Sequence, residues 1–70
     1  MMVNVANRLK VLRAEHRLSQ MDTADRASIP YNRFWRIENG YTDPTDEERQ
    51  ALAAVFGVAV SRVFPRRKVA

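Results

Sequence analysis

One stretch of this chain, residues 18–44, limits its possible folds more than any other part. It opens with Leu-Ser-Gln at 18–20, makes a Ser-Ile-Pro turn at 28–30, and reaches Glu-Asn-Gly at 38–40, with Pro44 beyond. Serine starts helices well, proline suits the first turn of a helix, and glycine takes the left-handed conformation that ends one. The stretch therefore predicts a helix, a sharp turn and a second helix.

The rest of the chain predicts an all-α fold with five short helices in total. In the first segment, about residues 4–15, Val5, Leu9 and Leu12 share one helical face. Thr45 and Glu48 have the spacing of a capping box, and the helix that they start should end at Gly57. A last short helix is expected over 60–64. Residues 1–65 should form one domain, and the basic tail, 66–70, is expected to fray.

Composition excludes several classes of function. Seventy residues suffice for one small domain. The chain has no cysteine and one histidine, so we expect neither a disulfide nor a metal site. Its two glycines form no phosphate-binding loop, and no catalytic constellation is present, so we expect no enzyme activity and no cofactor. No apolar run approaches a membrane span and no signal peptide opens the chain, so a cytoplasmic protein is expected.

Charge is unevenly distributed along the chain, which carries a net charge of +4. Residues 8–36 contain seven Lys or Arg and three Asp or Glu, whereas residues 38–48 contain five acidic residues and no basic one. Four basic residues between Arg62 and Lys68 then restore the positive sign. Such a pattern attracts a polyanion at two regions and repels it between them.

The second helix of the pair, about residues 31–39, has a polar and aromatic outer face. At 100° per residue, Phe34 and Ile37 point to one side, which we take as the core side. The remaining side chains form the outward face and its flanks: Tyr31, Asn32, Arg33, Trp35 and Arg36. A tryptophan on such a face is unusual if the face is merely solvated.

These side chains have chemistry suited to a DNA groove. Arg36 can donate two parallel hydrogen bonds to guanine, and Asn32 can pair in both directions with adenine. Trp35 can contact a thymine methyl group, and Tyr31, near the helix start, can bond a phosphate. The face therefore predicts a surface that contacts bases and backbone in the major groove. Trp35 and Tyr31 have an alternative interpretation as packing residues.

The chain resembles the Cro/C1-type, or XRE, helix-turn-helix family, which includes lambdoid phage repressors and controller proteins of restriction–modification systems. The resemblance extends over roughly residues 5–64. It rests on these residues, which align without a gap: Leu18-Ser19-Gln20, Ala24, Ile29, Phe34, Ile37-Glu38-Asn39-Gly40, Pro44, Leu52-Ala53, Phe56-Gly57-Val58 and Phe64. It implies a lambda-repressor-like fold and double-stranded DNA as the partner.

The resemblance also implies roles for individual residues. Gln20 is similar to a family glutamine that bonds a phosphate or an adjacent base. Tyr31, Asn32 and Arg36 fall on base-reading positions, and Thr42 falls in a loop that grips the backbone in relatives. The resemblance implies a further, structural feature, a partly buried ion pair between Arg13 and Glu38. Arg33 has two possible roles, a phosphate contact or a solvated side chain.

The sequence departs from the family pattern at the first helix of the pair and at the turn. Thr23 and Ala27 stand where relatives usually have leucine, and Pro30 replaces the usual side-chain cap. Each change removes apolar burial or capping energy, so we hypothesise that the monomer is only marginally stable. Alternatively, Phe34 and Trp35 fill the space that the small residues leave.

Relatives act as symmetric dimers on inverted repeats, so a homodimer is expected. Val58, Val60, Val63 and Phe64 are predicted to form its seam, with closure of the chain's own core as the alternative. The resemblance implies a transcriptional regulator, a repressor or autoregulator, that acts by occupying an operator. The alternative function is a protein-interaction module, since the exposed Trp35 and the acidic run 38–48 would also suit a partner protein.

Overall fold

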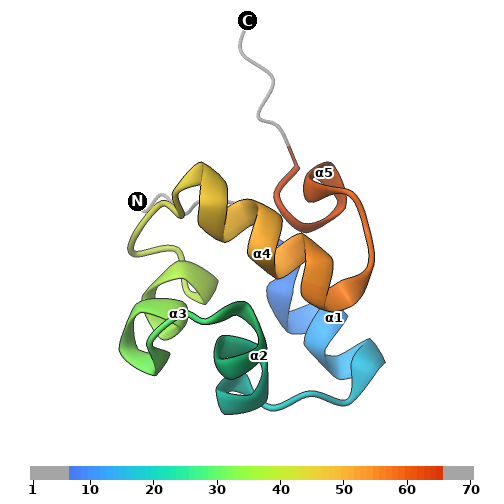
Figure 1. Cartoon of the computed structure of the whole chain (residues 1–70), viewed down its shortest axis with the longest axis horizontal. Helices are drawn as coiled ribbons and strands as arrows, with labels where there is room; N and C mark the ends of the chain where they lie inside the picture. The colour runs from blue at the N-terminus through green and yellow to red at the C-terminus, as the bar shows by residue number, and fades with distance from the viewer. Residues whose placement is uncertain (1–6, 66–70) are drawn as a thin grey trace, which may run out of the picture.

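A computed structural model describes residues 7–65, and in that range the chain is all-helical, as predicted (Figure 1). The five helices are α1 (Leu9–His16), α2 (Gln20–Ala27), α3 (Tyr31–Glu38), α4 (Asp46–Phe56) and α5 (Val60–Val63). None of the helices between residues 7 and 65 has the length and apolar character needed to cross a membrane. Val5 and the basic tail, 66–70, lie outside the described residues.

The helices surround a single apolar core. α2 packs against both α3 and α4, and α5 packs on α4. Figure 1 shows α2 and α3 side by side, joined by the turn at 28–30, with α1 behind α4. The core contains these buried apolar residues: Leu9, Leu12, Ala24, Ala27, Ile29, Phe34, Ile37, Leu52, Ala53, Phe56, Val63 and Phe64. Its position leaves one side of α3 open to solvent.

Local hydrogen bonds start α2 and α4 where the sequence predicts. The Ser19 hydroxyl accepts from the Asp22 backbone N–H at 2.9 Å, and the Thr45 hydroxyl accepts from the Glu48 N–H at 3.1 Å. Both reciprocal bonds are also present, so both capping boxes are confirmed. α3 has no side-chain cap at Pro30, as expected.

α1 begins at Leu9, so Asn7 and Arg8, which the sequence predicts to be helical, precede the helix. The predicted start at about residue 4 lies outside the described residues. The Asn7 side-chain oxygen accepts from the Leu9 N–H at 3.0 Å, and the Arg8 N–H donates to the Val63 carbonyl at 2.8 Å. The backbone around Arg8 is therefore bonded to α5 and does not continue the helix. Apolar periodicity alone gives no sign of these bonds.

The end of the chain closes the core, which corrects one prediction. Val63 is fully buried and Phe64 is 9% exposed, and both belong to the apolar core of this chain. They therefore present almost no surface to a second copy, and the predicted dimer seam is wrong for these two residues. Val58 and Val60 are partly buried against the core. Thr23 is also fully buried, and its hydroxyl donates to the Ser19 carbonyl.

α1 and α2 each end on a non-glycine residue in a strained backbone conformation. Arg17 and Ser28 have φ values of 56° and 58°, in the left-handed region. The turn after α2 needs this conformation, because the Ile29 N–H then donates back to the Ala24 carbonyl at 2.9 Å. A non-glycine residue is strained there by about 1–2 kcal/mol.

Ser28→Gly is therefore expected to raise the free energy of unfolding by about 0.5–1 kcal/mol, after the extra entropy of an unfolded glycine is subtracted. Urea denaturation measures the change. Ser61→Gly, inside α5, is the matched control and is expected to lower stability by about 0.5–1 kcal/mol. Destabilisation by Ser28→Gly would contradict the proposed strain.

Candidate nucleic-acid interface

The outer face of α3 lies where the sequence places it. Phe34 and Ile37 are fully buried, whereas Asn32 and Arg36 are exposed on the opposite side. Tyr31 is also exposed, at the start of α3. Amide, guanidinium and phenol groups thus share one side of a helix whose other side is fixed in the core.

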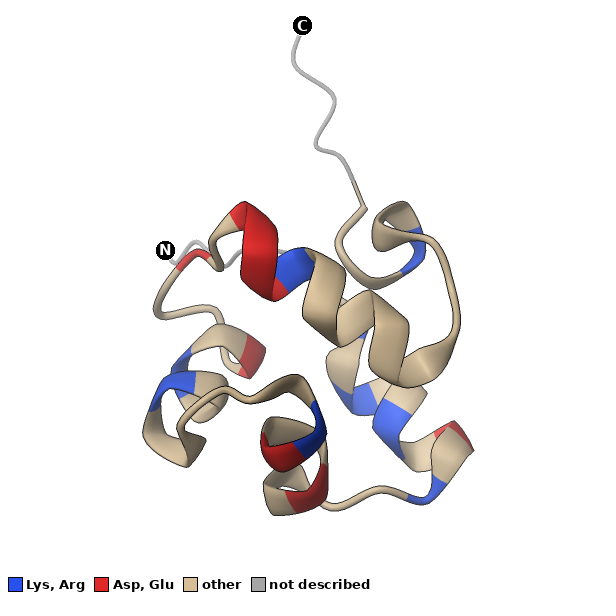
Figure 2. Cartoon of the chain, in the orientation of Figure 1, with Lys and Arg blue, Asp and Glu red and all other residues tan. Residues whose placement is uncertain are grey.

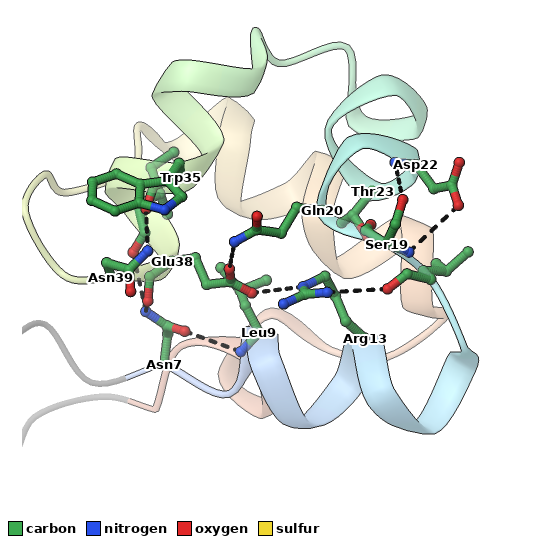
Figure 3. A network of polar contacts seen from close by, with 12 residues as sticks. Asn7, Leu9, Arg13, Ser19, Gln20, Asp22, Thr23, Trp35, Glu38 and Asn39 are labelled. Atoms are coloured by element: carbon green, nitrogen blue, oxygen red, sulfur yellow. Dashed lines mark hydrogen bonds and ion pairs between the residues drawn. The ribbon is translucent and has the colours of Figure 1, made fainter.

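A series of hydrogen bonds fixes α3 on its buried side. Arg13 Nε donates to Glu38 Oε2 at 2.7 Å, and Gln20 Nε2 donates to Glu38 Oε1 at 2.6 Å. Figure 3 shows Glu38 between the other two side chains. The Glu38 side chain is fully buried and the Arg13 side chain is 19% exposed. A single carboxylate thus joins α1, α2 and α3.

These hydrogen bonds extend to the exposed face, because the Tyr31 hydroxyl donates to Gln20 Oε1 at 3.1 Å. Both ends of the Gln20 amide therefore have protein partners. One hydrogen of Gln20 Nε2 and the lone pairs of the Tyr31 oxygen remain for other bonds. The arrangement holds two polar groups side by side at the starts of α2 and α3.

Asn7 holds the other end of α3, a role that the sequence did not suggest. Its side-chain nitrogen donates to the carbonyls of Ile37 at 3.2 Å and Glu38 at 3.3 Å (Figure 3). The last carbonyls of a helix have no partner within the helix, so a side chain that bonds two of them fixes that end. Asn7 falls inside the helix that the sequence predicts from about residue 4, and no local signal identifies a partner thirty residues away.

Arg33 is not simply solvated, because its guanidinium pairs with a carboxylate of the same chain. Its Nη2 donates to Glu48 Oε1 at 2.8 Å, and its Nε pairs with the second carboxylate oxygen. A weaker bond runs to the Asp43 carbonyl. The pair joins α3 to the start of α4. Hydrogen bonding from Arg33 holds the pKa of the Glu48 carboxyl below its usual range, with the Thr45 backbone N–H adding to the effect.

The lowered pKa of Glu48 predicts a pH-dependent contribution to stability. A depressed folded-state pKa stabilises the fold fully above the unfolded pKa, about 4.3, and the contribution is lost as pH falls through the folded pKa. Glu48→Gln removes the charge, and glutamine still suits a capping box. We expect the wild type to be the more stable at pH 7, with the difference shrinking below about pH 4.

Urea denaturation of both proteins between pH 3 and pH 7 measures this difference. All other carboxylates titrate in both proteins, so their effects cancel in the comparison. A difference that stays constant across the whole range would contradict a role for the Arg33–Glu48 pair.

Trp35 stacks on Tyr41, a residue that the sequence analysis did not select. The ring centroids are 5.5 Å apart and the planes differ by 12°. Trp35 is 41% exposed, whereas Phe34 is fully buried and belongs to the same core cluster as Ala27. A signal was available, because the residue after a helix-ending glycine commonly contacts the last turn of that helix. Tyr41 has this position relative to Gly40. Thr42, next to it, is partly buried.

Opposite charges gather on α3 and at the start of α4, as Figure 2 shows. Basic residues lie on α3, and the first turn of α4 is acidic. Of the five acidic residues in 38–48, Glu38 and Glu48 are paired with the arginines described above. Asp43, Asp46 and Glu47 are exposed. Arg36, by contrast, is exposed on α3 and belongs to neither of these two ion pairs.

Comparisons with known proteins agree with this architecture. A family model described as a helix-turn-helix domain matches residues 5–63. Over 58 residues the chain is 34% identical to an uncharacterised HTH-type transcriptional regulator of Methanocaldococcus jannaschii, covering 83% of this chain and 88% of that protein. α2, the turn at 28–30 and α3 supply the corresponding motif. The chain belongs to the helix-turn-helix domain family.

Proposed function

We propose that this protein is a transcriptional regulator that binds double-stranded DNA in a sequence-specific manner, with α3 in the major groove. The observation that carries the proposal is the exposed polar face of α3, the second helix of the motif, held in place by Glu38 from within. The relative named as a transcriptional regulator supports it. The net charge of +4 also suits a polyanionic partner.

Each side chain on the face has a distinct role in this proposal. Arg36 donates to guanine O6 and N7, and Asn32 pairs with adenine N6 and N7. Tyr31 and Gln20 use their remaining hydrogen-bonding capacity on a phosphate or an adjacent base. Thr42, in the loop after α3, contacts the backbone. Arg33 has a smaller part, because a phosphate would have to compete with Glu48 for its guanidinium.

Regulation would follow from occupancy of a promoter operator, and the regulator would be a repressor or autoregulator of the Cro/C1 type. A homodimer would place two α3 helices in successive major grooves, about 34 Å apart. Its seam would include Val58 and Val60, which are only partly covered by this chain. An inverted repeat with that spacing in the bound DNA is the expected result.

A protein-interaction module is the second candidate function. The exposed rings of Trp35 and Tyr41 favour it, together with the exposed acids at the start of α4. Large exposed apolar side chains often mark protein interfaces. In that case the outer face of α3 would bind a protein, and charge would contribute less to the affinity.

Salt dependence of binding to a random-sequence DNA duplex tests the proposed function. For a DNA-binding protein, log K falls linearly with log salt, with a slope of about −0.9 for each phosphate contacted. We expect a slope equivalent to several contacts, measured by fluorescence anisotropy at increasing potassium chloride. Absence of duplex binding at low salt would exclude the proposal and favour the second candidate.

A further inference from the structure

Two large aromatic side chains lie together on the solvent side of the motif. Trp35 is 41% exposed and Tyr41 is 72% exposed, whereas Phe34 and Phe56 are buried. We call Trp35 and Tyr41 the aromatic pair. An exposed aromatic ring forgoes the stabilisation that burial would give, because its apolar surface stays in contact with water. Packing of the monomer therefore does not account for the outer side of the pair.

The turn after α3 brings Tyr41 next to Trp35. Gly40 has a φ of +81°, which turns the chain back over the helix end. The Tyr41 N–H then donates to the Arg36 carbonyl at 2.8 Å, and the Gly40 N–H donates to the Ile37 carbonyl at 3.2 Å. The Asn39 side chain also donates to the Trp35 carbonyl at 2.9 Å (Figure 3). The backbone under both rings is therefore fixed.

The pair shares the outward side of α3 with the proposed base-reading residues. Trp35 follows Asn32 by three positions, which places the two on the same side of a helix, and it directly precedes Arg36. Tyr41 covers one side of the indole, so its other face and its edge remain available. If α3 enters a major groove, the indole enters with it.

A major groove offers few apolar partners to an indole. The faces of the bases are covered by their stacked neighbours, and most groups on their edges are hydrogen-bond donors or acceptors. The apolar group on that edge is the C5-methyl of thymine. A cytosine methylated at C5 presents the same group at the same place. An aromatic surface in the groove therefore matches a pyrimidine methyl.

We propose that the aromatic pair is a methyl-reading site, at which Trp35 contacts the C5-methyl of a pyrimidine in the bound DNA. Tyr41 is a positioning residue, since stacking restricts the indole to one orientation before DNA arrives. Restricting a side chain in advance reduces the entropy lost on binding. This inference rests on the proposed function and adds a chemical group that its hydrogen-bonding residues do not recognise.

The test uses a duplex that this protein enriches from a random library. Each thymine in turn is replaced by uracil, which removes only the methyl group, and each cytosine by 5-methylcytosine, which adds it. We expect one position in each half-site where the methyl group changes the affinity about 4-fold, the effect of one buried methyl group. Loss with uracil identifies thymine as the source, and gain with 5-methylcytosine identifies methylated DNA.

Variants then connect the effect to the aromatic pair. Trp35→Ala is expected to abolish the methyl dependence at that position, and Tyr41→Ala to reduce it. Tyr41→Phe keeps the ring and should restore what Tyr41→Ala loses. Val11→Ala, which shortens an exposed apolar residue on α1, should keep the full dependence. Circular dichroism of each variant checks that the fold is intact.

Three results would overturn the inference. An enriched duplex without any methyl-dependent position would do so, as would methyl dependence that survives in Trp35→Ala. Equal weakening of all duplexes by Trp35→Ala would assign the indole to the sugar–phosphate backbone instead. These results leave the proposed function standing. Failure to bind or enrich any duplex would overturn both.

Discussion

Glu38→Gln is expected to lower the free energy of unfolding by about 3 kcal/mol. The Glu38 carboxylate is fully buried and accepts from both Arg13 and Gln20. Glutamine offers one side-chain oxygen where the structure uses two, and it leaves the Arg13 charge without its counterion. Breaking a buried ion pair costs about 3–5 kcal/mol, and the partial exposure of Arg13 favours the lower end.

Urea denaturation at pH 7 measures this loss. A domain of this size has about 5 kcal/mol of stability or somewhat more, so the variant should keep only about 2 kcal/mol and unfold at a clearly lower urea concentration. Glu15→Gln is the matched control, because Glu15 is exposed on α1, and it should change stability by no more than about 0.5 kcal/mol. Equal effects of the two substitutions would show that Glu38 is not central to the fold.

Arg36→Ala is expected to weaken binding to the preferred duplex by about 5- to 150-fold, which corresponds to the 1–3 kcal/mol of one bidentate base contact. The guanidinium is exposed on α3, while Arg13 and Arg33 are paired with carboxylates. Removing a base contact affects one position, so the variant should also lose its preference at a single base pair. Fluorescence anisotropy with the preferred duplex and its single-base variants measures both effects.

Two controls separate base recognition from loss of charge. Arg62→Ala removes the same charge from the exposed surface of α5, and its effect should be smaller and equal for all sequences. Gln20→Ala removes a proposed phosphate contact together with the hydrogen bond that Gln20 donates to Glu38, and it should also weaken all sequences about equally. If Arg36→Ala lowered the affinity for preferred and scrambled duplexes alike, Arg36 would be a backbone contact.

Features fixed by neighbouring residues could be predicted from the sequence. The capping boxes at Ser19 and Thr45 depend on residues three positions apart. Gly40 and Gly57 end their helices because the left-handed conformation costs glycine little. The buried side of α3 followed from the helical repeat of Phe34 and Ile37. The exposed face followed from the same repeat, because it consists of the α3 side chains that do not point into the core.

Features that join distant segments could not be predicted in the same way. The Asn7 contact with the end of α3 and the Arg33–Glu48 pair depend on how helices meet, and periodicity does not contain that information. The sequence predicts Val63 in a dimer seam, because the last segment is more apolar than one short helix needs. The core needed it instead, because a domain of this size must bury apolar residues from its last helix.

The proposed function requires the outer face of α3 to recognise a DNA sequence. Selection from a random duplex library at moderate salt, followed by sequencing, tests it most directly. We predict enrichment of an inverted repeat whose half-sites lie about one helical turn apart, as expected when two copies of α3 enter successive major grooves. A library that remains random after selection, with weak salt-sensitive binding or none, would contradict the claim and assign this face of the molecule to a protein partner.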